Sequence, residues 1–406
     1  MPSTGTGPPV CYTCAVPRFS PFPGLRFDPT RHDLATVTAP PYDVIDDAGR
    51  AALAASDPHN VVRLDLPSGD DCYTEAGRCL DRWIAEGVLV RDEPVFYGYR
   101  MSWDDVDTGP GSTTGVLGAL ELSRPGEGGI LPHEQTTKKA KTDRLDLLRG
   151  ARANLSAVWG LSPAVGLAAL CEPAEDADVW EWADADGVVH VLWVIDDPVV
   201  MGRIADVVAS DAVVIADGHH RYETSLAYRD ERVAGDGDAG DAAAALVYLV
   251  ELSEDQLRVG PIHRLVDGLP EGFDLLRALE PFFDVSTGPV PATVREMEAA
   301  GVMVLVLTDR RVALRPRDGA FEGVRDLDTS RLDAALADLP PHTLTYQHGV
   351  DAIAAKVAAG EAQAGVLMRP ATVGQILEIA HGGERMPPKT TFFWPKPRTG
   401  AVFRTL

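Results

Sequence analysis

The segment "IADGHHRYET", residues 215–224, concentrates side chains that can do chemistry. It places Asp217, Gly218, His219, His220 and Arg221 in consecutive positions, directly after the apolar run "AVVIA". The chain has ten histidines, and two of them stand side by side here. An acid, two imidazoles and a guanidinium at the end of a buried strand predict a functional site.

The order of these residues is typical of an anion site at a strand–helix turn. Gly218 permits a tight turn and a close approach of the backbone to a ligand. A helix that begins near His220 or Arg221 would direct its free N–H groups and its positive dipole end toward the turn. Arg221 and His220 add phosphate donors, while Asp217 could act as a base or hold Mg²⁺. The alternative is a capping aspartate with locally packed histidines and a surface arginine pair.

A second candidate segment is "HEQTTKKAKTDR", residues 133–144. Glu134 could be a general base or a metal ligand. Lysines and hydroxyls suit phosphate; the candidate side chains for phosphate or substrate are His133, Thr136, Lys138, Lys141 and Arg144. The open alternative is a charged loop that caps the following helix at Thr142 or Asp143.

A third segment, "MPPKTTFFWPKP", holds Lys389 and Lys396 on either side of three aromatic residues. We select Lys389 as a phosphate-binding candidate, although the aromatic residues could simply bury the loop. Weaker substrate-binding candidates come from "PPYDV" and "GPIHRL"; they are Tyr42, Asp43, His263 and Arg264. With Asp217 and Glu134, His219 completes the predicted catalytic group.

The elements around these motifs predict an α+β fold with mixed sheets. "NVVRLDL" (60–66) alternates like a strand, residues 72–87 have helical periodicity, and "PVFYGYRM" (94–101) and "TTGVLGALEL" (113–122) are expected to be paired strands. Helices are expected at 198–209 and from about Asp143, with a strand ending at Asp217. We divide the chain into a mobile leader (1–20), an N-terminal α/β region (21–265) and a C-terminal α/β lobe (266–406).

Composition narrows the class of protein. The formal net charge is −24, which disfavours binding to nucleic-acid backbones. No run of 18 apolar residues and no secretory signal is present, so we expect a cytoplasmic protein without membrane spans. Cys11 and Cys14 form a lone CxxC whose role is open, and the oligomeric state cannot be read from the sequence.

Several of these motifs together resemble a widespread family of prokaryotic proteins catalogued as a domain of unknown function. The resemblance runs from about Pro21 to the C-terminus and rests on five segments: "PPYDVI", "LPHEQTTKKAKTDRLDLLR", "IADGHHRYETSLAYR", "PIHRLV" and "MPPKTTFFWPKP". The DGHHR box also resembles the free-serine kinases of the ParB/sulfiredoxin-like fold. That resemblance implies a ParB/sulfiredoxin-like core in which Asp217 is the base or metal holder. It further implies that His219, His220 and Arg221 bind nucleotide phosphates.

The resulting hypothesis is a nucleotide-dependent kinase that phosphorylates a small hydroxy-amino acid, with serine favoured. ATP or ADP with Mg²⁺ would be the donor. The same residues could instead dephosphorylate phosphoserine. A third possibility is a nucleotide-binding regulator of the ParB kind that carries out no small-molecule chemistry.

Overall fold

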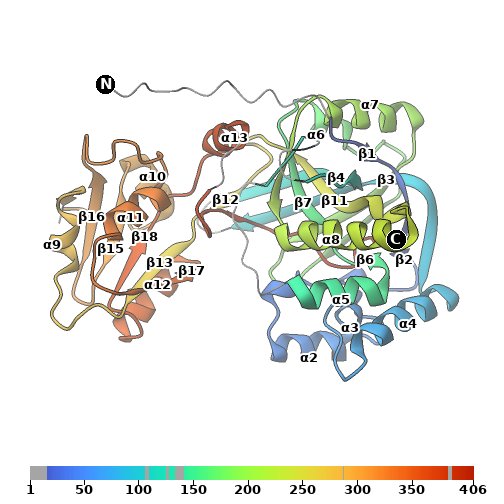
Figure 1. Ribbon diagram of the computed structural model, residues 1–406, viewed down its shortest axis with the longest axis horizontal. Coiled ribbons are helices and arrows are strands. Elements are labelled where there is room, and N and C mark those ends of the chain that lie inside the picture. The colour runs from blue at the N-terminus through green and yellow to red at the C-terminus, as the bar shows by residue number, and fades with distance from the viewer. Residues whose placement is uncertain are drawn as a thin grey trace.

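The computed structural model describes residues 16–105, 109–124, 127, 129–132, 141–286, 288–382 and 386–406. They form two lobes that stand side by side, each with its own sheet and helices (Figure 1). The predicted α+β class, with mixed sheets and a second α/β lobe, is confirmed.

A ten-stranded mixed sheet organises the larger lobe. Eight strands follow the order β5-β10-β7-β11-β4-β3-β9-β8, while β1 pairs with β4 and β2 with β3. The strands are β1 Phe19–Ser20, β2 Phe22–Phe27, β3 Leu89–Asp105, β4 Gly109–Glu121, β5 Ile130–Pro132, β7 Val158–Ser162, β8 Val179–Ala183, β9 Val189–Ile195, β10 Val213–Asp217 and β11 Ala244–Glu251. β3 and β4 are the predicted paired strands. Strand β10 runs parallel to β5 and antiparallel to β7, so the sheet is mixed at the point where the DGHHR segment begins.

Helices cover both faces of this sheet. They are α1 Leu34–Val37, α2 Asp47–Ser56, α3 Val62–Asp65, α4 Cys72–Ala85, α5 Lys141–Ala151, α6 Leu167–Leu170, α7 Pro198–Ala209 and α8 His219–Asp236, with short 3₁₀ turns η1 Tyr42–Val44 and η3 Gly240–Ala243. Each face of the sheet has its own hydrophobic core, and strand β10 contributes side chains to both. Val214 packs in the core that includes residues of α4 and α5, while Val213 packs in the core that includes residues of α6 and α7. No helix in the described part of the chain is both long and apolar enough for a membrane crossing.

The predicted strand at 60–66 is wrong, because this segment contains the short helix α3. The Asn60 side chain explains the difference: its Oδ1 accepts from the Val62 backbone N–H at 2.9 Å. Its Nδ2 donates to the Thr36 carbonyl at 2.7 Å. These bonds start a helical turn, and tertiary context overrides the alternating pattern.

The smaller lobe has a six-stranded sheet in the order β14-β16-β15-β18-β13-β17. Its strands are β13 His263–Asp267, β14 Phe283–Ser286, β15 Met303–Val306, β16 Arg311–Pro316, β17 Thr343–Gln347 and β18 Ala364–Leu367. Its helices are α9 Leu275–Leu279, α10 Val294–Ala300, α11 Asp328–Leu336 and α12 Val350–Ala358. Helix α13 Val373–His381 lies between the lobes (Figure 1), and its Ile376 and Ile379 join the core cluster of the larger lobe.

The C-terminal segment returns from the smaller lobe to the larger one. Residues Phe392–Phe393 (β19) pair with Val259–Gly260 (β12), and Arg404–Thr405 (β20) pair with Ala153–Asn154 (β6). Phe403 is completely buried in the core of the larger lobe. The boundary expected at 265/266 therefore falls inside β13, and residues 392–406 pack with the first region in space.

The N-terminal boundary also differs from the expectation. Residues 1–15 of the predicted leader lie outside the described residues. Phe19 and Ser20 form β1, which pairs antiparallel with β4, and the Phe19 side chain is buried against Phe96. The structured chain thus begins before residue 21.

Candidate functional site

The DGHHR segment forms the strand–helix turn that its sequence predicts. β10 ends at Asp217, and α8 begins at His219, one residue before the predicted start. Gly218 between them has φ 83°, a left-handed conformation that favours glycine. A Cβ atom at Gly218 would lie 2.8 Å from Arg221 Nε, so a side chain there would displace the Arg221 guanidinium.

Asp217 is the centre of a charged cluster at this turn. Its Oδ1 accepts from Lys396 Nζ at 3.0 Å, and its Oδ2 accepts from Arg221 Nη2 at 2.8 Å. Lys396 Nζ also lies 3.2 Å from Asp43 Oδ2. One ammonium group therefore bridges two carboxylates that are 174 positions apart in sequence.

Asp217 and Lys396 are both charged at neutral pH. Burial alone would raise the pKa of Asp217, but Lys396 and Arg221 hold that pKa below its ordinary value. Burial alone would lower the pKa of Lys396, but Asp217 and Asp43 hold it above its ordinary value. The positive charge of His219 would also lower the pKa of Asp217, which places this imidazole within electrostatic reach of the carboxylate.

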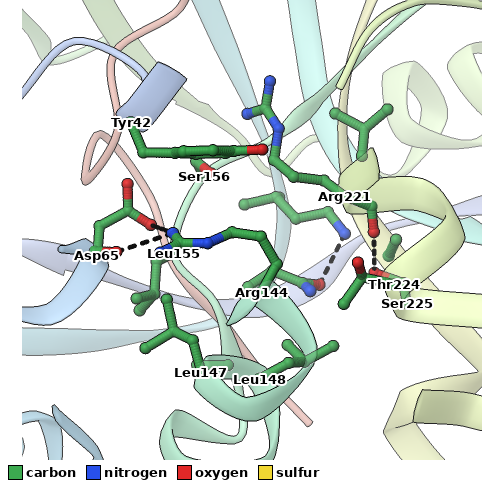
Figure 2. A pocket seen from close by; sticks show the side chains of 15 residues that line it. Tyr42, Asp65, Arg144, Leu147, Leu148, Leu155, Ser156, Arg221, Thr224 and Ser225 are labelled. Atoms are coloured by element: carbon green, nitrogen blue, oxygen red, sulfur yellow. Dashed lines mark hydrogen bonds and ion pairs between the residues drawn. The ribbon is translucent and has the colours of Figure 1, made fainter. Parts of the chain in front are cut away.

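Arg221 joins the Asp217 cluster to a neighbouring pocket. Its Nη1 donates to the Ala157 carbonyl at 2.5 Å, while its Nη2 holds Asp217. The same side chain lines a pocket that is partly open to solvent. The pocket lies between α5, α8 and the strands β6, β7 and β11 (Figure 2).

Arg144 and Tyr42, two residues predicted from separate motifs, meet in this pocket. The guanidinium carbon of Arg144 lies 4.4 Å from the centre of the Tyr42 ring, an arrangement that is clear in Figure 2. Arg144 Nη1 donates to the Asp65 carbonyl at 2.8 Å and lies 3.2 Å from Asp65 Oδ1. Its Nη2 lies 2.7 Å from Asp143 Oδ2. Arg144 therefore links α5 to α3 and holds the wall of the pocket.

The other C-terminal lysine, Lys389, lies at the junction of the lobes. Its carbonyl accepts from Arg264 Nη2 at 2.9 Å, and its backbone has φ 60°. Its charge contributes to lowering the pKa of His348, after the larger effect of burial. It is Lys396 and not the selected Lys389 that pairs with Asp217.

His263 and Arg264 are buried at the start of β13. The Nδ1 atom of His263 accepts from the Met368 backbone N–H at 3.1 Å, and burial lowers the pKa of His263 to about 4. Arg264 Nη1 donates to the Ile262 carbonyl at 2.7 Å. Both side chains hold the backbone at the lobe junction.

Part of the predicted site lies outside the described residues: His133, Glu134, Thr136 and Lys138. Lys141 opens α5, but its side chain is likewise outside the description. Strand β5 ends at Pro132, opposite Ile215 of β10. In the sequence, His133 and Glu134 therefore follow directly after β5, a strand that runs parallel to β10 and its last residue Asp217.

Sequence reasoning missed two residues that the structure places at the centre. The sequence offers one signal for Lys396, because it is one of six lysines in an acidic chain and lies on a proline-flanked loop. Asp65 lies in the segment 60–66 that the sequence predicts as a strand, and no sequence feature marks it as a site residue among the other acidic residues of the chain. Its side chain is 6% exposed and faces Arg144, a contact that only the fold reveals.

The family model described as "Protein of unknown function (DUF1015)" matches residues 19–330. The chain belongs to this family. This confirms the resemblance to a family of unknown function. The comparison with curated protein sequences finds no match.

Several solved structures resemble the chain at low identity. A free serine kinase mutant in complex with AMP has a TM-score of 0.36 and 16% identity, covering 65% of this chain and 84% of that one. A conserved hypothetical protein from Pyrococcus furiosus has a TM-score of 0.33 and 14% identity, covering 65% and 87%. SbnI with a C-terminal truncation, from Staphylococcus aureus, has a TM-score of 0.35 and 11% identity, covering 71% and 81%. With TM-scores below 0.5, these similarities carry no conclusion about what this chain binds.

Proposed function

We propose that this protein transfers a phosphoryl group from a nucleotide to the hydroxyl of a small amino acid, with serine as the favoured acceptor. The observation that carries the proposal is the ion pair between Asp217 and Lys396 at the first turn of α8. It brings an ionised carboxylate, a half-buried ammonium and the first backbone N–H groups of α8 to one place. Phosphoryl transfer depends on positioning and on stabilising charge, which are the tasks such groups perform.

Each group has a distinct task in the transfer. The backbone N–H groups at the start of α8 receive phosphate oxygens, and His219, His220 and Arg221 add donors beside them. The acceptor oxygen forms a bond to phosphorus as the bond to the leaving nucleotide breaks. Lys396 offsets the negative charge that moves to the leaving oxygen.

Asp217 orients the acceptor hydroxyl. Because its pKa is depressed, it is a weak base, and it takes the hydroxyl proton only late, as the new bond forms. Glu134 stays the predicted stronger base. Mg²⁺ bound with the nucleotide would neutralise phosphate charge, and Asp217 is the residue predicted to hold it. Lys396 Nζ lies between Asp217 and Asp43, so a metal between those carboxylates would have to displace the ammonium.

The test is to incubate the full-length protein and Mg²⁺ with ATP, ADP or CTP, with and without serine. Phosphorus NMR would follow phosphoserine and nucleotide together. We expect phosphoserine to form in an amount equal to the nucleotide consumed. Hydrolysis of added phosphoserine without nucleotide would favour the phosphatase. Tight nucleotide binding without turnover for any hydroxy-amino acid would favour the regulator.

A further inference from the structure

The pocket beside Asp217 contains a buried hydroxyl that lacks a protein partner. Thr224 is 4% exposed and lines the pocket from the first turns of α8. Within the described part of the chain, its Oγ1 makes no hydrogen bond. Ser225 differs, because its hydroxyl donates to the Arg221 carbonyl at 2.9 Å. An unpaired buried hydroxyl costs free energy, and a ligand atom that bonds to it would recover that cost.

The charged side chains of the pocket are already paired within the protein. Arg144 is held by Asp65 and Asp143, and Arg221 by Asp217 and the Ala157 carbonyl. A free amino acid needs a cation for its carboxylate and an anion for its ammonium. The pocket therefore suits a neutral group better than the amino-acid acceptor.

The remaining walls are apolar with a few hydroxyl and amide groups. Figure 2 shows the Tyr42 ring, Ser156 and three leucines around the pocket. The apolar lining residues are Leu147, Leu148, Ala153, Leu155, Val158, Ala245 and Leu246. A nucleobase matches this composition, because it has apolar faces and a polar edge.

The pocket also lies at a suitable distance from the phosphate-binding turn. Thr224 is on the helical turn that follows Arg221, and one turn of helix rises about 5.4 Å. Arg221 reaches both Asp217 and the pocket. A ligand in the pocket could thus extend past Arg221 to the start of α8.

From these contacts we propose that the pocket takes the nucleoside end of the donor nucleotide, with Thr224 as a specificity-determining contact. This inference rests on the proposed function, and it deepens it by dividing the ligand between two sites. The base lies between the leucines and α8, Thr224 bonds to its polar edge, and the phosphates run past Arg221 to Asp217 and Lys396.

The test is calorimetry on full-length variants with four probes: ATP, adenosine, cytidine and inorganic tripolyphosphate. Thr224→Val preserves the shape of the side chain and removes its hydroxyl. It should raise the Kd for ATP and for the nucleoside that binds by about threefold to tenfold, while tripolyphosphate keeps its affinity. Ser156→Leu, which fills a half-buried position, should raise the same constants by about tenfold or more. Thr329→Val is the control, since Thr329 is a buried threonine of the smaller lobe.

The outcomes separate this inference from the proposed function. Unchanged nucleoside and ATP affinities in both pocket variants, with normal phosphoserine formation, would overturn only the pocket assignment. Equal weakening of ATP and tripolyphosphate would overturn it too, because the pocket would then sense the phosphates. A higher KM for serine alone would assign the pocket to the acceptor. Nucleoside binding that depends on Thr224, without any phosphoserine, would support the pocket and refute the kinase.

Discussion

The two ends of α8 carry ion pairs of the same chemistry in opposite surroundings. At the first turn, the side chains of Asp217, Arg221 and Lys396 are 25%, 13% and 13% exposed. Further along, Arg149 pairs with Glu231 at 2.5 Å, and these side chains are 46% and 43% exposed. Exposed pairs form at little cost and contribute little, whereas buried charges lose hydration that their partners must replace.

This difference in exposure identifies the charged side chains whose desolvation costs the folded state free energy. The cluster at Asp217 joins three separate segments of the chain, because Asp43 follows the first helix and Lys396 comes from the C-terminal strand region. A charge cluster of this kind contributes less to stability than apolar packing would. We therefore infer that the cluster at Asp217 serves function, whereas the exposed Arg149–Glu231 pair is an ordinary surface ion pair.

The largest effect on stability is expected for Lys396→Met. The change leaves Asp217 and Asp43 without their shared ammonium, and breaking a buried pair costs about 3 kcal/mol of unfolding free energy. Chemical denaturation measures this loss. The control is Lys356→Met, whose exposed pair with Glu361 at 3.7 Å should contribute less than about 1 kcal/mol. Equal effects of the two substitutions would contradict the contrast between buried and exposed pairs.

The pH dependence of unfolding of Lys396→Met provides a second test of the same comparison. In the wild type the pKa of Asp217 lies below its ordinary value, so its contribution to stability is complete above the pKa of the unfolded state and is lost as the pH falls through the folded pKa. Without Lys396, we expect the pKa of Asp217 to rise, because burial still raises it and one of the charges that lower it is gone. Acid unfolding of Lys396→Met should therefore begin at a higher pH than in the wild type. An unshifted acid transition would mean that Lys396 does not control this carboxylate.

Arg221→Ala should act on the ligand. Loss of a charged hydrogen-bond donor weakens nucleotide binding by about 1.5–3 kcal/mol. Calorimetry with ATP and ADP measures the change. Arg232→Ala, which breaks the exposed pair with Asp236 on the same helix, is the matched control and should bind nucleotide like the wild type. A wild-type affinity for Arg221→Ala would remove this residue from the proposed phosphate site.

The smallest effect is expected for Glu231→Gln. It breaks the exposed pair with Arg149, so the unfolding free energy should change by less than about 1 kcal/mol, and less again in high salt. Turnover should not change. A larger loss than that of Lys396→Met would reverse the ranking of the two ends of α8.

The strand–helix turn at Asp217 could be predicted because its signals are local. An apolar run followed by Asp217 and Gly218 specifies a strand end and a left-handed turn within a few residues. The helix at 198–209 was predicted for similar reasons, and Asp197 caps it by accepting from the Val199 backbone N–H at 2.7 Å.

The contacts of Lys396 and Asp65 could not be predicted because they are set by long-range packing. Lys396 reaches Asp217 only because the C-terminal segment returns to the larger lobe and is held there. Buried hydrogen bonds hold it: the Arg398 backbone N–H donates to Tyr99 Oη at 3.2 Å, and Tyr99 Oη lies 2.8 Å from His190 Nδ1. Neither a residue pattern nor a spacing encodes such a return.

The proposed role of Asp217 can be tested by measuring nucleotide binding and phosphoserine formation on one preparation of Asp217→Asn, beside the wild type and Glu231→Gln. The substitution keeps the shape of the side chain and removes its charge. We predict that turnover falls by about 100-fold or more while nucleotide still binds. Glu231→Gln should match the wild type in both measurements. Full turnover by Asp217→Asn with every nucleotide and acceptor that the wild type uses would contradict the account, since Asp217 would then serve only as a structural residue of the turn.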